Sequence, residues 1–328
     1  MPRDDAMIAA VTGASGFIGR HLVRRLVKEG MDVRLLEHRS SWHWPESCQT
    51  FAGDVTDPAS LKGLLSGADI VFHLAAALGA STLDRKGFER INVFGTVNLL
   101  QEARRTGVQR VVHFSSAGVL GRVQPGEVAD ESTPCRPQDV YDQTKLAGEQ
   151  KALEDAAAGQ DVVILRPGWV YGPEDRRTFK LIRPIARRRF MLVTRGRALQ
   201  TPVFIDDLIQ GILLCAQKGE SGAIYHLAGP EVLSVRQIVD AVAAGCGTRV
   251  PRVTLPLFPV RIAAWKLDKT FRWFRREAPL TPGKLAFFIH PKPLSSAKAQ
   301  RDLGYVPAID FLTGMTRTIA WYRDHGWL

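Results

Sequence analysis

A glycine-punctuated turn between a strand and a helix is the strongest constraint on this chain. Residues 7–12 (MIAAVT) are apolar and suited to a strand, and apolar side chains then recur at helical spacing, at Phe17, Ile18, Leu22 and Leu26. Gly13, Gly16 and Gly19 therefore fall at the turn, where backbone can approach a ligand and the helix directs unpaired N–H groups at an anion. A second strand-like run follows at residues 31–37, so the pattern predicts dinucleotide binding.

The next part of the chain alternates strand-like and helix-like runs. The apolar run DIVFHLAA (69–76) is followed by a helical segment from about Lys86 to Arg105 and then by the strand-like RVVHFSS (110–116). Such alternation is typical of a parallel sheet covered by helices on both faces. We predict an α/β fold, a Rossmann-type doubly wound parallel sheet with a smaller, mainly helical C-terminal substrate lobe.

The boundary between the two parts is not a single cut. We expect residues 1–167 plus about 201–227 to form the dinucleotide-binding domain, and about 168–200 and 228–305 to form the substrate lobe. Residues 306–328 would form a closing C-terminal helix. Because there is no internal repeat and no low-complexity linker, the two parts should share one compact body.

Ten segments, met in order along the chain, resemble a known family. They are TGASGFIG, GDVTD, HLAA, INVFGTVNLL, HFSSAGVLG, YDQTK, ILRPGWVYGP, PVFIDDL, YHLAGPE and AKAQRDLGYVP. The chain resembles an extended short-chain dehydrogenase/reductase of the NAD-dependent epimerase/dehydratase family. It is nearest to dihydroflavonol reductases, 3β-hydroxysteroid dehydrogenases and hopanoid-associated epimerase-like members. The resemblance implies NAD or NADP as cofactor, a small-molecule substrate and a homodimer.

The resemblance also implies a catalytic set, which maps onto Ser116, Tyr141 and Lys145, with Ser115 as a competitor for the serine. Tyrosine ionises near pH ~10, too high for a base at neutral pH. A lysine at i+4 on the same helical face, with the positive oxidised nicotinamide above, would favour the phenolate. Tyr141 would then exchange the hydroxyl proton while hydride moves to or from the ring. Ser116 would hold the same oxygen, and Lys145 would also bind the nicotinamide ribose.

Cofactor-binding positions follow from the glycine turn and from the resemblance. Asp54 and Val55 resemble the pair that holds adenine, and Pro167 opens the segment beside the nicotinamide carboxamide. Asn92 resembles a helix asparagine that organises the site, although it could equally be a polar residue facing a loop. The full predicted set is Gly13, Ser15, Gly16, Phe17, Ile18, Gly19, Glu37, Arg39, Asp54, Val55, Leu74, Ala75, Ala76, Asn92, Ser115, Tyr141, Lys145 and Pro167.

The choice between NAD and NADP depends on the end of the second strand. Glu37 lies at about the distance where an acidic residue accepts bonds from the ribose hydroxyls and repels a 2′-phosphate, which favours NAD. Arg39, with His38 and Ser40, could instead hold that phosphate. We favour NAD and keep NADP as the alternative.

Two substrate positions depart from the sugar-nucleotide enzymes of the family. Those enzymes commonly have an asparagine where this chain has Trp169, and an arginine where it has Gln200. Two phosphate contacts are therefore missing, which favours an apolar or differently charged substrate; Trp169 could stack on a ring or simply pack in the cleft wall. The predicted substrate contacts are Ala77, Ser116, Trp169 and Gln200.

Residues 176–197 hold nine arginines and lysines and no acid, against a net charge of +11 for the chain. This block could attract an anionic substrate group or an acidic membrane surface, or it could be a solvated basic helix. The charge is local and no nucleic-acid motif is present, so we expect no nucleic-acid partner.

Residues 255–276 form an amphipathic basic segment, with Val260, Ala264, Leu267, Phe271 and Phe274 at helical spacing. The apolar stripe could pack on the substrate lobe or lie on a membrane surface. In either case the segment is expected to roof the cleft.

The four cysteines are scattered without a close pair, and the first five residues are polar and lead directly into the first strand. These features favour a reducing cytoplasm, and they predict neither metal nor disulfide. The basic segments 176–197 and 255–276 leave open peripheral contact with a membrane. We therefore expect an NAD(P)-dependent oxidoreductase acting at a secondary alcohol or ketone of a bulky, partly apolar substrate. The alternatives are a sugar or nucleotide-sugar epimerase or dehydratase that retains its cofactor, and a non-catalytic module that senses NAD(P).

Overall fold

A seven-stranded parallel sheet forms the centre of the molecule. The computed structural model describes residues 6–38, 42–78, 83–249, 254–274 and 278–328. The sheet has the spatial order β11-β6-β5-β4-β1-β2-β3. Its strands are β1 (Ile8–Thr12), β2 (Asp32–Glu37), β3 (Cys48–Ala52), β4 (Ile70–His73), β5 (Arg110–Phe114), β6 (Val162–Pro167) and β11 (Ile224–Leu227). Strand order reverses between β1 and β4, so a crevice opens at their carboxyl ends, and the predicted α/β Rossmann-type sheet is confirmed.

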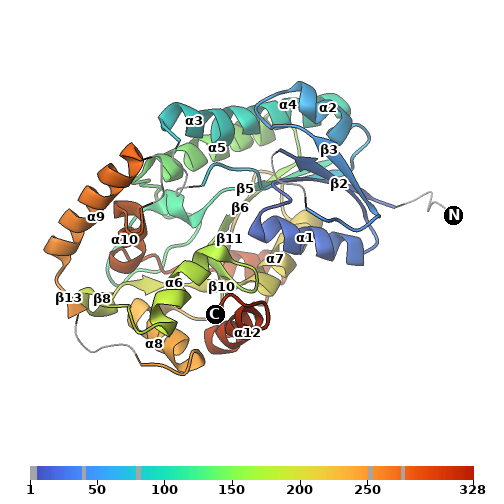
Figure 1. Cartoon of the computed structure of the whole chain (residues 1–328). Helices are drawn as coiled ribbons and strands as arrows, with labels where there is room; N and C mark the ends of the chain where they lie inside the picture. The colour runs from blue at the N-terminus through green and yellow to red at the C-terminus, as the bar shows by residue number, and fades with distance from the viewer. Residues whose placement is uncertain (1–5, 39–41, 79–82, 250–253, 275–277) are drawn as a thin grey trace.

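Helices cover both faces of the sheet (Figure 1). One layer contains α1 (Phe17–Lys28) and α7 (Ile205–Lys218), which contact each other. The other contains α2 (Ala59–Leu65), α3 (Arg85–Glu89), α4 (Gly95–Thr106) and α5 (Val140–Ala157). Strands covered on both faces lose their alternation of polar and apolar side chains, and Ala9, Ala10 and Val11 of β1 are all fully buried.

The helix predicted over residues 86–105 contains a π-helical turn. Residues Arg90–Phe94 form this turn, and they connect α3 to α4 without a break. Gly148 of α5 packs against the turn so closely that a Cβ there would lie 2.4 Å from the Asn92 carbonyl oxygen. The π-helical turn therefore places Asn92 where α5 packs against it.

The substrate lobe is built from short strand pairs and helices. β7 (Trp169–Tyr171) pairs with β10 (Pro202–Phe204), β8 (Leu192–Val193) with β13 (Thr254–Leu255), and β9 (Leu199–Gln200) with β12 (Leu233–Ser234). The helices are α6 (Arg176–Ala186), α8 (Val235–Gly245), α9 (Leu257–Trp273), α10 (Pro282–Ile289), α11 (Ala297–Leu303) and α12 (Phe311–Asp324). Two 3₁₀ turns lie at Ala117–Leu120 and Thr194–Gly196. Helices dominate the lobe as predicted, whereas the strand pairs were not foreseen.

One hydrophobic core continues through both parts. It joins Leu22 and Leu35 of the dinucleotide-binding half to Val239 and Ile319 of the lobe. Helix α12 contacts α8 and β10, and the Tyr322 hydroxyl donates to the Asp175 carbonyl oxygen at 2.6 Å. The last helix therefore secures the lobe to the segment that follows β7.

Candidate active site

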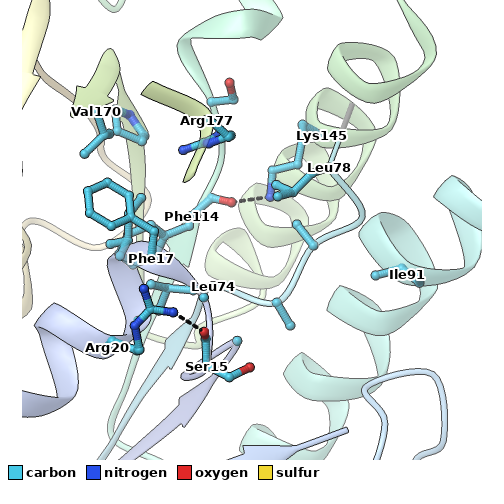
Figure 2. A pocket seen from close by; sticks show the side chains of 18 of the residues that line it. Ser15, Phe17, Arg20, Leu74, Leu78, Ile91, Phe114, Lys145, Val170 and Arg177 are labelled. Carbon is cyan, nitrogen blue, oxygen red and sulfur yellow. Dashed lines mark hydrogen bonds between the residues drawn. The ribbon is translucent and has the colours of Figure 1, made fainter. Parts of the chain in front are cut away.

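A cavity of about 620 Å³ lies at the carboxyl ends of the central strands and contains most of the predicted site (Figure 2). The predicted residues that line it are Gly13, Ser15, Gly16, Phe17, Ile18, Gly19, Asp54, Val55, Leu74, Ala75, Ala76, Ser115, Ser116, Tyr141, Lys145, Pro167 and Trp169. They come from six parts of the chain that only the fold brings together. Glu37, Ala77, Asn92 and Gln200 do not line the cavity, and Arg39 lies outside the described residues.

The glycine turn has no room for a side chain at Gly13 or Gly19. Gly13 has φ +71°, and a Cβ there would lie 2.7 Å from the Ala75 nitrogen. A Cβ on Gly19 would lie 2.3 Å from the Gly13 carbonyl oxygen. Helix α1 begins at Phe17 behind Gly16, and no side chain caps it. Free N–H groups at a helix N-terminus and close backbone approach suit a pyrophosphate, so the residues present fit a dinucleotide.

At the adenosine end, Asp54 and Val55 line the cavity together with His38, which the sequence suggested only as a possible partner of Arg39 for a 2′-phosphate. Asp54 Oδ2 lies 3.1 Å from His38 Nε2. Partial burial raises the pKa of Asp54, but hydrogen bonds from Thr56 together with the nearby His38 and Arg90 hold the pKa below its usual value. Asp54 is therefore an ionised acceptor at this end of the cavity.

The structure differs from the prediction at Glu37. Its Oε1 accepts a hydrogen bond from the Trp44 indole nitrogen at 2.6 Å and from the Trp42 amide at 3.3 Å. The carboxylate is thus directed to the loop after β2 and away from the cavity. Direct contact with the ribose would require it to leave Trp44.

Strand β5 and helix α5 position the catalytic set. Ser116 is the second residue after β5, and its Oγ accepts from the Gly118 amide at 2.9 Å. Helix α5 begins behind Asp139, whose side chain accepts from the Asp142 amide, so Tyr141 lies in the first turn and Lys145 one turn later. The Ser116 side chain lies close enough to Tyr141 to lower the pKa of its hydroxyl, whereas Ser115 Oγ is buried with no partner among the described residues. This geometry favours Ser116 over Ser115.

Burial controls the protonation of the pair. It raises the pKa of Tyr141, which the neighbouring Asp142 raises further and the Arg177 charge lowers in part. Burial also lowers the pKa of Lys145 to about 8. The Lys145 ammonium donates to the Phe114 carbonyl oxygen (Figure 2). Near neutral pH Lys145 therefore keeps most of its positive charge in the cavity that also holds Tyr141.

Asn92 connects three elements beneath the cavity. Its Oδ1 accepts from the Ala77 amide at 2.7 Å, and its Nδ2 donates to Thr144 Oγ1 at 3.0 Å. The side chain is buried, so it holds the segment after β4 against the helix that carries Tyr141. This arrangement favours the organising role over a polar residue facing a loop. It also explains why neither Asn92 nor Ala77 contacts the cavity.

His73 is a neutral core residue. Its Nδ1 lies 2.8 Å from Thr12 Oγ1 and its Nε2 lies 3.1 Å from Thr96 Oγ1. Complete burial, with the Lys145 charge nearby, lowers its pKa to about 3. Both ring nitrogens are hydrogen-bonded to buried threonine hydroxyls, which leaves neither for proton transfer.

Aromatic side chains form the wall beyond the catalytic pair. Trp169 lines the cavity, and its ring packs edge-on against Phe287 of α10, with ring centroids 4.9 Å apart. Gln200 is a correction to the prediction, because its amide nitrogen donates to the carbonyl oxygens of Phe287 and His290 at 2.9 and 3.0 Å. It holds the end of α10 in place and does not face a substrate.

The start of α6 adds charged residues that sequence reasoning placed only within a broad basic block. Of residues 176–197, only Arg176 and Arg177 line the cavity. Arg20 of α1 also lines it and pairs with Glu174 at 2.8 Å. The signal available in the sequence was Asp175, a helix-capping residue type directly before Arg176 and Arg177. None of the described residues forms a cluster of three His, Cys, Asp or Glu side chains able to hold a metal, and the four cysteines are free.

The doubly wound sheet, the glycine turn and the tyrosine–lysine helix at one crevice define an extended short-chain dehydrogenase/reductase. Residues 9–228 match the NAD dependent epimerase/dehydratase family, and the chain belongs to this family of NAD(P)-dependent dehydrogenases, reductases, epimerases and dehydratases. None of the described helices is long and apolar enough to cross a bilayer.

The chain is similar to proteins named as a ketoreductase and a sterol demethylase protein. The chain is 31% identical over 313 residues to a ketoreductase of 4-hydroxy-2-methyl-3-oxo-4-farnesyl-3,4-dihydroquinoline-1-oxide from Stigmatella aurantiaca, covering 93% of each chain. It is 31% identical to sterol demethylase protein B of Methylococcus capsulatus, covering 98% of this chain and 99% of the relative. Among solved structures, a dTDP-glucose 4,6-dehydratase of Streptomyces venezuelae with NAD and TYD bound has a TM-score of 0.79 at 28% identity, and 98% of each chain is covered.

Proposed function

We propose that this protein transfers hydride between NAD(P) and a secondary alcohol or ketone of a bulky, partly apolar substrate. One observation carries the proposal: Trp169, backed by Phe287, walls the same cavity as Tyr141. In addition, Gln200 donates to the α10 carbonyl oxygens, so the two positions that contact phosphate in sugar-nucleotide enzymes supply neither the asparagine nor the arginine that makes the contact. An apolar wall favours an apolar skeleton by removing its surface from water.

The residues of the chain then have separate tasks. Tyr141 gives the proton to the carbonyl oxygen in reduction and removes it in oxidation, while Ser116 holds that oxygen by a hydrogen bond. Lys145 and the glycine turn hold the dinucleotide, which supplies or accepts the hydride when bound. Asn92 is a positioning residue that holds the α5 helix.

We propose NAD as the preferred cofactor. Asp54 places an ionised carboxylate at the adenosine end of the cavity, where it would oppose a 2′-phosphate. NAD is also the cofactor in the similar dehydratase structure. Titration with NADH and NADPH tests the choice, and tighter binding of NADPH would contradict it.

We further propose a homodimer located in the cytoplasm, with contact to a membrane surface. Family members often pair through the helix that carries the tyrosine and lysine, and Phe94, which precedes α4, is 59% exposed. A mass measurement in solution tests the dimer.

The test of the reaction is the Tyr141→Phe variant, because it removes one hydroxyl from the cavity. We expect reduction of a panel of aryl and steroid ketones to fall by about 10³-fold, with the Kd for NADH unchanged. Thermal unfolding of the variant provides the folding control. A protein that only senses NAD(P) would show no ketone reduction before the substitution, and that result would contradict the proposal.

A second candidate, epimerisation or dehydration of a sugar nucleotide, is favoured by the similarity to the NAD-containing dehydratase. Such an enzyme returns the hydride and keeps its cofactor. Dinucleotide carried through purification, together with turnover that consumes no added NADH, would favour this candidate over a net reductase.

A further inference from the structure

Helix α9 is apolar on two opposite faces. Val260 and Ala264 point inward, where they pack with Val193 and with Leu285 of α10. This confirms packing for that part of the predicted stripe. A surface helix normally has polar residues on its outward face, so we would expect only one apolar stripe, the buried one. Here the outward face needs a separate explanation.

The outward face carries three large exposed apolar side chains. Phe258 is 76% exposed, Ile262 41% and Trp265 52%. Their spacing of i, i+4 and i+7 places them on one side of the helix, opposite Val260 and Ala264. In the view of Figure 1, α9 lies at the edge of the molecule remote from β2 and β3. Nothing in the described chain covers this face.

Cations surround the outward face. Lys269 lies over the Trp265 ring, with its Nζ 4.3 Å from the ring centroid. Arg261 and Lys266 are exposed on the flanks. The only acid in α9 is Asp268, which is half-buried. An apolar centre with a basic rim suits the interface of an anionic bilayer, where aromatic rings and long basic side chains reach both the acyl chains and the headgroups.

The two basic segments meet at the start of this helix. Strands β8 and β13 pair in parallel, with Val193 opposite Leu255, so the end of the 176–197 block lies beside the beginning of α9. A shallow hollow of about 430 Å³ opens there, lined by Thr194, Arg195, Arg197, Thr254, Leu255 and Pro256. Thr194 and Arg195 have φ of 52° and 61°, a conformation that non-glycine residues seldom adopt. The strained turn presents Arg195 and Arg197 beside the exposed apolar face.

We propose that the outward face of α9, with the Arg195–Arg197 hollow, binds the surface of an anionic lipid bilayer. Phe258, Ile262 and Trp265 would enter the interface, and the arginines would meet lipid phosphates. A net charge of +11 attracts such a surface and opposes a second copy of the same basic face.

Helix α10 connects this surface to the cavity. Its Leu285 packs against Val260 and Ala264, and its Phe287 packs against Trp169 in the cavity wall. If the substrate is an apolar ketone, as the proposed function requires, docking would bring the cavity next to the lipid phase that dissolves it. This second step rests on the proposed function; the docking surface itself does not.

Vesicle co-sedimentation of the full-length protein tests the surface. We expect binding to vesicles of phosphatidylcholine with phosphatidylglycerol, little binding to phosphatidylcholine alone, and release by salt. The double variant Phe258→Ser/Trp265→Ser should bind at least about tenfold more weakly than the unmodified protein, because it removes the inserted side chains. The control Val128→Ser/Leu312→Ser removes two exposed apolar side chains elsewhere (52% and 57% exposed) and should bind as the unmodified protein does.

A charge variant tests the hollow independently. Arg195→Ala/Arg197→Ala should weaken vesicle binding by roughly tenfold, whereas Arg25→Ala/Lys28→Ala on α1 removes the same charge and should have a smaller effect. Absence of binding to either vesicle would overturn the inference and point to an acidic protein as the partner. Equal loss in the test and control variants would overturn it as well.

Activity separates this inference from the proposed reaction. A water-soluble aryl ketone assayed without vesicles reports the reaction alone, and a steroid ketone dissolved in the vesicles reports delivery. We expect the Phe258→Ser/Trp265→Ser variant to lose kcat/KM on the steroid ketone only. Vesicle binding without reduction of either ketone would contradict the proposed function and support the membrane-binding surface. Reduction without vesicle binding would support the proposed function and contradict the membrane-binding surface.

Discussion

The dinucleotide-binding half and the substrate lobe are built by different means. In the first, β1 pairs with β2 over five consecutive residues, and the cofactor turn depends on backbone atoms in close contact. In the second, strand pairs of two or three residues join distant segments, and side chains such as Trp169 form the wall. The cofactor turn of the first half depends on glycines that leave backbone uncovered, whereas the cavity wall of the second half depends on the surfaces of side chains. The two halves should therefore respond differently to substitution.

The largest expected contrast is between two glycines. In Gly19→Ala, the new Cβ would lie 2.3 Å from a backbone oxygen, so the turn must shift and NADH binding should weaken by more than about 100-fold. In Gly283→Ala of α10, the nearest neighbour lies 3.9 Å away, so the substitution should be neutral or slightly stabilising. Fluorescence titration with NADH and thermal unfolding measure both effects. Similar losses in the two variants would remove the distinction between the halves.

A second contrast lies within the dinucleotide-binding half. Ser116→Ala should lower kcat for ketone reduction by about 10²-fold, because it removes the hydrogen bond to the reacting oxygen. Ser115→Ala should change kcat by less than about twofold, because its hydroxyl has no partner among the described residues. Steady-state kinetics distinguish them. The opposite ranking would reassign the serine of the catalytic set.

The pH dependence of ketone reduction tests whether the reaction needs the charge of the buried Lys145. The pKa of Lys145 is lowered to about 8, so its charge is present below that pH and lost above it. Burial raises the pKa of Tyr141, so Tyr141 stays protonated and able to donate. We expect kcat/KM for ketone reduction to fall above pH 8, by about tenfold per pH unit at the limit. In Lys145→Met this decline should disappear; if it persists, another group titrates.

The smallest effect is expected in the lobe. Trp169→Leu or Phe287→Leu should raise KM for bulky ketones by about tenfold, in keeping with loss of part of a buried aromatic contact. Neither should change the Kd for NADH, since both side chains lie beyond the glycine turn. A change in NADH affinity equal to the change in KM would show that the aromatic wall also shapes the cofactor site.

The sequence indicated the first half better than the second, for a physical reason. Gly13, Gly19, Tyr141 and Lys145 were predicted from spacing within one turn or one helix, and such spacing is visible in the sequence. Gln200 could not be placed in this way, because the carbonyl oxygens that it binds are 87 and 90 residues away.

Two other residues show the same limit. The Glu37 carboxylate depends on the course of a loop, which brings the Trp44 indole to it. In α9, apolar residues recur on both faces, and only packing distinguishes the inward Val260 from the outward Trp265. Sequence patterns thus predicted elements and local sites, whereas side-chain partners distant in the chain required the fold.

The core that runs without interruption from Leu22 to Ile319 has a thermodynamic consequence. A protein whose parts share one core should melt in a single transition, and neither part should persist when the other unfolds. Dinucleotide bound at the glycine turn would then raise the melting temperature of the whole chain, including helices that it never touches. Mutations that weaken the far side of the lobe could accordingly be masked in a cell rich in cofactor and exposed in one that is poor in it.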